Sequence, residues 1–406
     1  MKKDSLLILA LAGCLGGASM LYFLGLAIHL PFVLTVLLIV AFAIMVLRYA
    51  RSNTQNPPAV SWLSTGILAA GISLITWQNH RLSTRWGDWD AWAMWNFHAR
   101  FLADGKHWTN LFQSLQYDHP DYPLGLPALL AFISRLSGGH GWMHIAFALH
   151  FLITLSIPVL IFLLLHRKRL VVAAATLIVF AFDDFYLLRG VSQYADTMLA
   201  AYFLMALVSL SYAGGDKRMI AAGIFFAGCA AWTKNEGIVL ALLLVLFYAR
   251  DFFSRQNLRY TAIGIVLPLI TLAVFKVIYA TSNDLFQHSD RSLLQQISDV
   301  HRYELIWSYF RKISGEYFTW TVIAMSLYVV ASILGKRRPD RPMLLLLTCL
   351  AAFLATYIFT PYDPAWHLHT SLNRLLHQLM PSFVYLIGLR LCEYRLPWFR
   401  SNSIKP

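Results

Sequence analysis

Long apolar runs separated by short polar segments dominate this chain, and their lengths predict its architecture. Runs of spanning length lie near 5–28, 30–47, 60–79, 141–165, 170–187, 196–213, 259–280, 317–335, 342–360 and 375–391, with a shorter pair near 219–233 and 238–249. A transmembrane helix needs about 20 apolar residues, whereas the strands of an outer-membrane barrel are about ten residues of alternating polarity. The pattern therefore predicts an all-α, polytopic membrane protein with 12 transmembrane helices, or 10 if the short pair is re-entrant.

The apolar segment at 122–137 is short, and its depth affects the predicted topology. Its 16 residues would reach about 24 Å as a helix, less than a hydrocarbon core of roughly 30 Å. If this segment spanned the membrane, the basic stretch HRKR at 166–169 would move to the outer side. Because basic loops favour the cytoplasm, we expect an interfacial or re-entrant helix here.

Composition and charge support a membrane protein and predict its orientation. Hydrophobic residues make up 58% of the chain and charged residues 13%, against roughly a quarter charged in soluble domains. The net charge of +13 comes largely from basic clusters near 48–51, 167–169, 250–259 and 336–341, which this topology places on one side. The excess is therefore an orientation signal, and no nucleic-acid partner is needed to explain it. We expect a multi-pass inner-membrane protein with both termini cytoplasmic.

The N-terminal apolar run is too long for a typical signal peptide, so we interpret it as a retained first span. The organisation we expect is one transmembrane domain over 1–406. Within it lie an N-terminal two-helix extension at 1–58, an outer loop with juxtamembrane helices at 80–140, and the remaining core at 141–395. The four cysteines fall in apolar segments without metal-ligand spacing, which favours buried free thiols.

Polar chemistry concentrates on the predicted outer face, and the stretch WGDWDAWAMWN at 86–96 is its densest part. Trp89, Trp92 and Trp95 suit the depth of lipid headgroups, and an aromatic belt would explain them. Such a belt does not explain Asp88 and Asp90, because a carboxylate near hydrocarbon is costly unless it has a partner or a task. We therefore favour a functional role for the two acids.

Three further segments carry charges toward the same face. Asp196 stands in the first turn of a predicted helix, where it could simply favour the helix dipole. In WTKNEG, Lys234 and Glu236 could neutralise each other at a hairpin, or Lys234 could meet a phosphate. Arg374, with His367 nearby, could snorkel to the interface or bind phosphate oxygens. Together these residues suggest one site for a lipid phosphate and an acceptor hydroxyl.

These motifs resemble those of the GT-C superfamily of membrane glycosyltransferases, which includes bacterial aminoarabinose transferases and protein O-mannosyltransferases. GDWDAWAMWNFHARFLADG looks like the first outer loop of that superfamily with its acidic motif, and SQYADTMLAAYFL is similar to its second acidic motif. DYPLGLPALL, WTKNEGIVLAL and AWHLHTSLNRLLHQLMP extend the resemblance over about 60–395. The resemblance implies a GT-C-like fold, a polyprenyl-phosphate sugar donor and an envelope glycan, lipid or protein acceptor.

The resemblance also implies roles for individual residues in an inverting displacement at the periplasmic or extracellular face. Asp90 would be the general base that takes a proton from the acceptor. Asp88 would position the acceptor or share a divalent metal, Mg²⁺ or Mn²⁺, with Asp90; relatives often carry Asp-Glu there, so the identity of the base stays open. The other candidate substrate-binding residues are Asp196, Lys234, Glu236, Arg374, Arg189, His367, Tyr122 and Trp92.

Two other classes of function remain open at this stage. A transporter or flippase of a lipid-linked saccharide would use the same aromatic and basic residues, but would need charges on both sides of a midplane pathway or repeated halves. A structural membrane subunit without a site would leave the clustered outer acids unexplained. The crowding of the acids on one face favours the enzyme.

Overall fold

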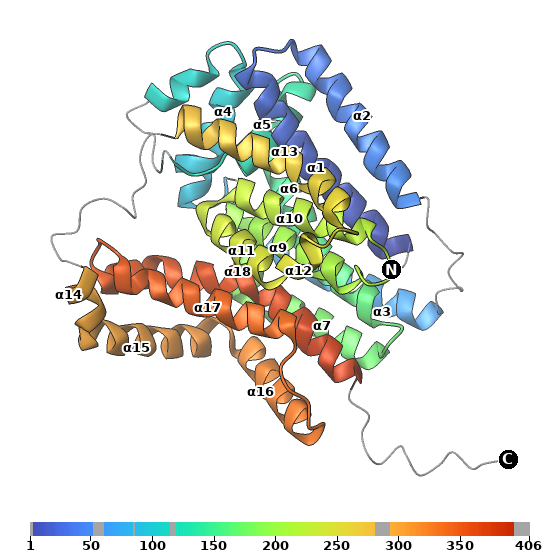
Figure 1. Cartoon of the computed structure of the whole chain (residues 1–406), viewed down its shortest axis with the longest axis vertical. Helices are drawn as coiled ribbons and strands as arrows, with labels where there is room; N and C mark the ends of the chain where they lie inside the picture. The colour runs from blue at the N-terminus through green and yellow to red at the C-terminus, as the bar shows by residue number, and fades with distance from the viewer. Residues whose placement is uncertain are drawn as a thin grey trace.

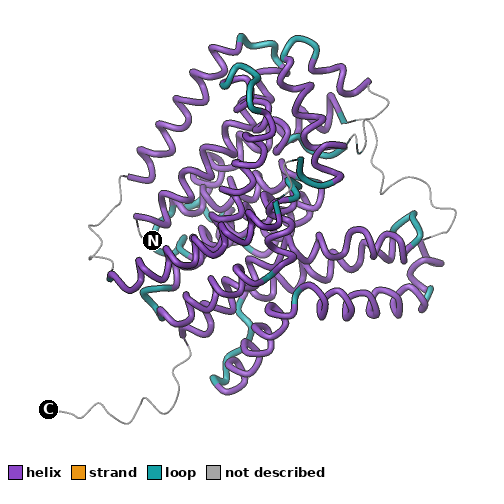
Figure 2. The backbone as a smooth tube through the Cα atoms, turned by 180° about the vertical axis from the view of Figure 1, so that it is seen from behind, coloured by secondary structure: helices purple, strands orange, loops and turns teal. Residues whose placement is uncertain are grey.

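The computed structural model describes residues 3–51, 61–83, 86–113, 119, 121–280 and 293–393, and every regular element in these ranges is a helix (Figure 2). The first half contains α1 (Lys3–Ala27), α2 (Phe32–Arg51), α3 (Trp62–Leu82), the π-helix η1 (Ala91–Trp95), α4 (Asn96–Asp104), the 3₁₀ helix η2 (Trp108–Gln113), α5 (Gly125–Leu136), α6 (Trp142–Leu165), α7 (Leu170–Phe182), α8 (Asp184–Val191) and α9 (Ala195–Ser211). The second half contains α10 (Arg218–Thr233), α11 (Asn235–Phe247), α12 (Ala249–Phe252), α13 (Leu258–Val274), the π-helix η3 (Phe275–Tyr279), α14 (Leu293–Ser298), α15 (Val300–Tyr317), α16 (Thr319–Leu334), α17 (Arg341–Phe359) and α18 (Pro364–Glu393).

The chain is an all-α polytopic membrane protein, as its hydropathy pattern predicts. Within the described ranges, six helices are long and apolar enough to cross a membrane: α1, α2, α6, α13 with η3, α17 and α18. Two bent pairs, α7 with α8 at 63° and α15 with α16 at 101°, raise the number to eight if each is one span. The expected 10–12 is larger because it counts shorter apolar helices such as α9 and α10, and also α3.

Helix α9 forms the centre of the bundle. Every residue of α9 except Ser211 is buried, and the helix packs against α6, α10 and α18. Helix α1 lies beside α2 and also packs on α5, α10 and α13, so the first helix belongs to the core (Figure 1). The core therefore combines helices from both ends of the sequence.

The apolar runs of the sequence leave residues 281–316 outside any predicted span, but the part of this segment that the structure describes, from residue 293, is largely helical. Val300–Tyr317 forms α15, which bends sharply into α16 at the lower edge of Figure 1. Hydropathy did not predict α15 because many of its residues are polar or charged. Only Arg302, Ile306 and Ile313 are buried on it. Arg302 anchors the helix by donating a 2.8 Å hydrogen bond to the carbonyl of Ile358.

Two short or displaced helices shape the region near the candidate site. Helix α5 has the shortness expected of 122–137, but nearly all of its 12 residues are buried against α1, α4 and α6. A short helix at membrane depth is tolerated where protein surrounds it. Helix α18 begins at Pro364, earlier than the apolar run at 375–391, so its first turns carry polar residues.

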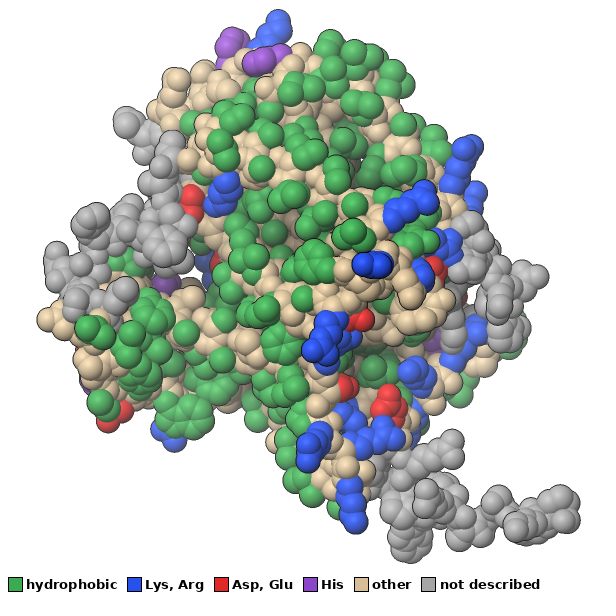
Figure 3. Space-filling view, viewed as in Figure 1, with side chains coloured by type: hydrophobic (Ala, Val, Ile, Leu, Met, Phe, Trp, Pro, Cys, Tyr) green, Lys and Arg blue, Asp and Glu red, His purple; other side chains and the backbone are tan. Residues whose placement is uncertain are grey.

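The surface is mostly apolar, with charge restricted in position. Figure 3 shows hydrophobic side chains over most of this face, with basic and acidic side chains gathered near α12 and the end of α16. There Arg341 pairs with Asp251 at 2.6 Å and Arg337 with Glu393 at 2.7 Å. A mostly apolar exterior is the surface expected of a membrane protein.

Candidate functional site

Five charged residues from distant parts of the sequence form one network, called here the ionic cluster: Asp90, Asp196, Lys234, Glu236 and Arg374. Asp196 is its centre and is fully buried. Its Oδ1 lies 3.0 Å from Lys234 Nζ, and its Oδ2 accepts from Arg374 Nε at 3.1 Å. The first turn of α9 thus places a carboxylate in a low-dielectric interior, where two cations compensate its charge.

The two ends of the ionic cluster are nearer to solvent than its centre. Arg374 Nη1 lies 2.7 Å from Asp90 Oδ2, with about a fifth of each side chain exposed. Lys234 Nζ lies 2.8 Å from Glu236 Oε1. One guanidinium therefore bridges the buried acid Asp196 and the accessible acid Asp90.

The local backbone explains how Lys234 reaches Asp196. Lys234 is the single extended residue between α10 and α11, with φ −156° and ψ 162°, so the two helices form a tight hairpin. Gly237 permits this close approach, since a Cβ there would lie 1.9 Å from the carbonyl oxygen of Ala230. The hairpin points Lys234 inward, where only 2% of its side chain is exposed.

The burial and the contacts of Lys234 favour its pairing with carboxylates over the phosphate contact considered as the alternative. Its ammonium contacts two carboxylates, those of Asp196 and Glu236. The contact is thus the self-neutralising Lys–Glu pair, extended by Asp196. Arg374 is the cation of the ionic cluster that lies nearer the surface, with 20% of its side chain exposed against 2% for Lys234.

Helix α18 contributes a second group to Asp196. Gln378 lies one turn beyond Arg374 and donates from Nε2 to Asp196 Oδ1 at 2.6 Å. Residues at i and i+4 share a helix face, so this face of α18 supplies both donors. Next to it, His377 Nε2 lies 3.0 Å from Thr197 Oγ1, which ties α18 to the same turn of α9.

Tyr194 joins the ionic cluster to the loop that carries Asp90. Its hydroxyl accepts a hydrogen bond from the backbone N–H of Asp90 at 3.2 Å, and its ring lies 4.9 Å from the Arg374 guanidinium carbon. Burial, and then the nearby Asp90 charge, raises the pKa of Tyr194 to about 12. The hydroxyl therefore keeps its proton at neutral pH and fixes the position of Asp90 without adding charge.

Asp88 has a different environment from Asp90. Its side chain is exposed and accepts from the backbone N–H of Trp89 at 2.8 Å, while its own N–H donates to the Ser192 carbonyl at 3.0 Å. Gly87, with φ +72°, allows this packing, because a Cβ there would lie 2.8 Å from the same carbonyl oxygen. Asp88 thus shapes the turn that presents Asp90.

The remaining expected site residues lie around the ionic cluster at different distances. Tyr122 stacks on Trp95 with 6.1 Å between ring centroids, and its ring lies 5.6 Å from Lys234 Nζ. Arg189 packs its guanidinium over Tyr194 at 5.1 Å. His367 Nδ1 is hydrogen-bonded to Thr360 Oγ1 at 2.8 Å and not to a member of the ionic cluster. It interacts with Glu236 through charge alone.

The tryptophans of the 86–96 stretch separate into two groups. Trp89 and Trp92 are more than half exposed and pack edge to face at 4.5 Å. Trp95 is fully buried, so the expectation that it lies among lipid headgroups is corrected. The π-helix η1 contributes to this, since it turns Trp95 and Met94 into the core while Trp92 stays outside.

A second polar network beside the ionic cluster was not expected from the sequence. Asn235 donates to Asp121 Oδ2 at 2.6 Å, and Lys276 Nζ lies 2.8 Å from Asn235 Oδ1. It is adjacent in sequence to Lys234 and Tyr122, so it braces both. The polar Lys276 within an apolar helix was the available signal.

The described residues do not fit a divalent-metal site. In these parts of the chain no group of three or more His, Cys, Asp or Glu side chains could hold an ion. Mg²⁺ and Mn²⁺ favour carboxylate and other oxygen ligands, yet one oxygen of Asp90 is bound to Arg374.

A cavity of about 150 Å³ lies beside the turn that carries Asp90, and is called here the indole cavity. It is lined by Trp86, Trp92, Asn96, Phe97, Arg100, Trp142, Met143 and Gln193. Inside it, Asn96 Nδ2 donates to Gln193 Oε1 at 3.1 Å. Since Gln193 precedes Tyr194 and Trp92 follows Asp90, the cavity and the ionic cluster share two backbone segments.

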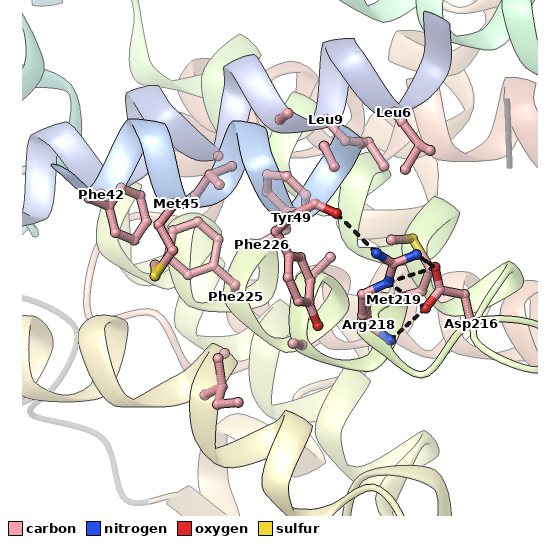
Figure 4. Close-up of a pocket in the computed structure, with 18 residues that line it drawn as sticks. Leu6, Leu9, Phe42, Met45, Tyr49, Asp216, Arg218, Met219, Phe225 and Phe226 are labelled. Carbon is pink, nitrogen blue, oxygen red and sulfur yellow. Dashed lines mark hydrogen bonds and ion pairs between the residues drawn. The ribbon is translucent and has the colours of Figure 1, made fainter. Parts of the chain in front are cut away.

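A groove of the same volume, about 150 Å³, lies toward the other end of α10. Figure 4 shows its apolar side chains from α1, α2 and α10, with Arg218, Asp216 and Tyr49 at one end. There Arg218 binds Asp216 at 2.8 Å and donates to the carbonyl of Tyr49 at 3.0 Å. This is called the apolar groove.

Comparisons of the chain with protein-family models, with curated proteins and with solved structures found no match.

Proposed function

We propose that this protein is a membrane glycosyltransferase that moves a sugar from a polyprenyl-phosphate donor to an acceptor hydroxyl at the outer face of the inner membrane. The observation that carries the proposal is the Arg374 bridge: an accessible carboxylate, Asp90, is held 2.7 Å from a guanidinium that is itself anchored on buried Asp196. A base and an anion-binding group thus stand side by side, as transfer from a lipid phosphate requires. The resemblance of the motifs to GT-C enzymes supports the same reaction class.

In the proposed reaction, the acceptor oxygen attacks the anomeric carbon, and the bond from that carbon to the phosphate oxygen breaks. The acceptor proton passes to Asp90, and the lipid phosphate leaves with the bonding electron pair. A phosphate is a good leaving group, so stabilising its charge matters more than protonating it. Arg374 suits this task because a guanidinium offers paired donors to phosphate oxygens.

The bridge also links donor binding to base activation. A phosphate beside Arg374 competes with Asp90 for the same guanidinium, which releases a carboxylate oxygen for the acceptor proton. Asp196 and Gln378 keep the α18 side of the bridge in place meanwhile. Lys234 shares its single positive charge between Asp196 and Glu236, which lowers the attraction of these acids for the arginine.

The proposal is tested with Asp90→Asn in membranes supplied with a radiolabelled polyprenyl-phosphate sugar. General base catalysis contributes about 10²–10⁴-fold, so transfer is expected to fall by that factor. Asp88→Asn is the matched control, two residues away and exposed, and should retain most transfer. Wild-type transfer by Asp90→Asn would exclude Asp90 as base, and sugar-lipid movement across the membrane without transfer would favour a flippase.

A further inference from the structure

Three residues that line the indole cavity carry buried polar groups without a partner among the described residues. Gln193 is 1% exposed and Asn96 is 7% exposed. Their mutual hydrogen bond uses one group of each, leaving Asn96 Oδ1 and Gln193 Nε2 without a partner among the described residues. Buried amides are normally satisfied, so an unused acceptor beside an unused donor indicates a ligand that supplies both.

The pairing does not depend on how the two amides are oriented. If both side-chain amides are flipped, Gln193 donates to Asn96, and one donor and one acceptor again remain. A hydroxyl group donates and accepts at once, and neighbouring hydroxyls on a ring match such a pair. The Trp142 Nε1–H is a third buried group without a partner among these residues.

The other lining residues define the faces of the ligand. Trp86 and Trp92 are 60% and 51% exposed, and they form an aromatic rim that also includes Phe97. Aromatic rings bury apolar faces while leaving polar edges free to bond, which suits the C–H face of a sugar ring. Roughly 10–15 Å³ of such space holds one water, so about 150 Å³ admits a small cyclic molecule.

The charge of the lining narrows the class of sugar. Arg100 is charged among the residues that line the indole cavity, and no carboxylate of the described residues is among them. A cationic amino sugar would therefore meet a like charge without compensation, whereas a neutral or acidic sugar would not.

We infer that the indole cavity is a binding site for one neutral or acidic monosaccharide unit, with the Asn96–Gln193 pair on its hydroxyls and the indoles on its ring. The inference rests on the proposed function, for which it supplies a saccharide-binding site. The lining residues Trp92 and Gln193 are close in sequence to Asp90 and Tyr194, so the cavity and the ionic cluster share two backbone segments.

The test uses the full chain in lipid nanodiscs and saturation-transfer NMR with D-glucose, D-galactose, D-galacturonate and D-glucosamine as probes. At neutral pH we expect at least one of the first three to bind and D-glucosamine to bind more weakly. Asn96→Leu with Gln193→Leu removes both amides together, which spares the fold an unpaired partner. It should weaken binding roughly tenfold or more, because two hydrogen bonds are lost.

Two single variants keep the result interpretable. Trp142→Phe keeps an aromatic ring but removes the indole N–H together with the pyrrole part of the ring, and should weaken binding severalfold. Trp62→Phe, at a 91% exposed indole on α3, should leave it unchanged. Absence of binding by all four sugars, or full binding by the double variant, overturns the inference.

The outcomes also separate this inference from the proposed function. If Asp90→Asn abolishes transfer while the double variant transfers and binds normally, the transferase stands and the sugar site is wrong. If the double variant loses binding while Asp90→Asn transfers like the wild type, the saccharide site stands and the assigned mechanism falls.

Discussion

The ionic cluster and the apolar groove lie toward opposite ends of α10. The charged residues at the two ends differ in their burial and in the number of partners that compensate them. Arg218 and Lys234 are 16 residues apart, which is about 24 Å along a helix. At the groove end, Arg218 and Asp216 neutralise each other with about a fifth of each side chain exposed. At the cluster end, Asp196 is fully buried and depends on partners from two other segments.

The cavities near these two ends of α10 show the same contrast. Each has a volume of about 150 Å³, but the groove is lined almost entirely by apolar side chains and the indole cavity by amides and indoles. An apolar groove at the surface of a membrane protein needs nothing beyond lipid to fill it. Buried amides with unused hydrogen-bonding groups need a polar occupant, so only one end indicates a specific ligand.

The largest expected effect follows from removing the acid at the centre of the ionic cluster. Asp196→Asn should lower the free energy of unfolding by about 3 kcal/mol, the lower end of about 3–5 kcal/mol for a broken buried pair. The lower end applies because Lys234 and Arg374 each keep one other carboxylate. Chemical denaturation in mixed micelles measures the change.

Asp216→Asn is the matched variant at the groove end. It should cost no more than about 1 kcal/mol, as expected of partly exposed ion pairs. Equal losses for the two variants would remove the distinction between the two ends.

A second, smaller effect concerns the hairpin that turns Lys234 inward. Gly237→Ala places a methyl group against the Ala230 carbonyl and should cost about 1–3 kcal/mol, because α10 and α11 must move apart. Thermal unfolding in detergent checks this. Gly66→Ala on α3 meets no atom within 4 Å and should be neutral or slightly stabilising; an equal loss there would mean that the close approach is not responsible.

The smallest expected effect concerns the tyrosine ring that packs against an arginine at each end of α10, Tyr194 with Arg374 and Tyr49 with Arg218. Tyr194→Phe keeps the ring under Arg374 but removes the hydroxyl that accepts from Asp90, so transfer should fall roughly fivefold, equivalent to about 1 kcal/mol. Tyr49→Phe, whose ring lies 5.2 Å from the Arg218 guanidinium carbon, should transfer normally. Similar rates for both variants would show that the Tyr194 hydroxyl does not position Asp90.

The sequence predicted the fold class and the members of the ionic cluster, because charged residues in an oily chain are few and costly. Asp90, Asp196, Lys234, Glu236 and Arg374 were all candidates before their contacts were known. The Lys234–Glu236 pair was one of the alternatives that the sequence offered. The other pairs could not be predicted, since spacing gives no distance between segments that are far apart in the chain. The role of Gln378 could have been predicted, because it lies four residues after Arg374 and therefore on the same face of α18.

Other features left no usable trace in the sequence. The Asn96–Gln193 pair joins residues 97 positions apart, and neither residue type is unusual in a loop. Trp95 resembles its exposed neighbours Trp89 and Trp92 in sequence, and only the π-helical turn separates them. Helix α15 was missed because its polarity resembles that of a loop when hydropathy is the only criterion.

The ionic cluster also constrains the order in which the newly made chain can mature. Arg374 is synthesised 140 residues after Lys234 (374 − 234), which takes roughly 7–28 s at about 5–20 residues per second. During that interval Lys234 can already pair with Asp196 and Glu236, but the second cation that compensates these acids has not yet been made. Asp90 is made first and gains its cation last, so its backbone can be held by Tyr194 before its carboxylate is paired with Arg374 on α18.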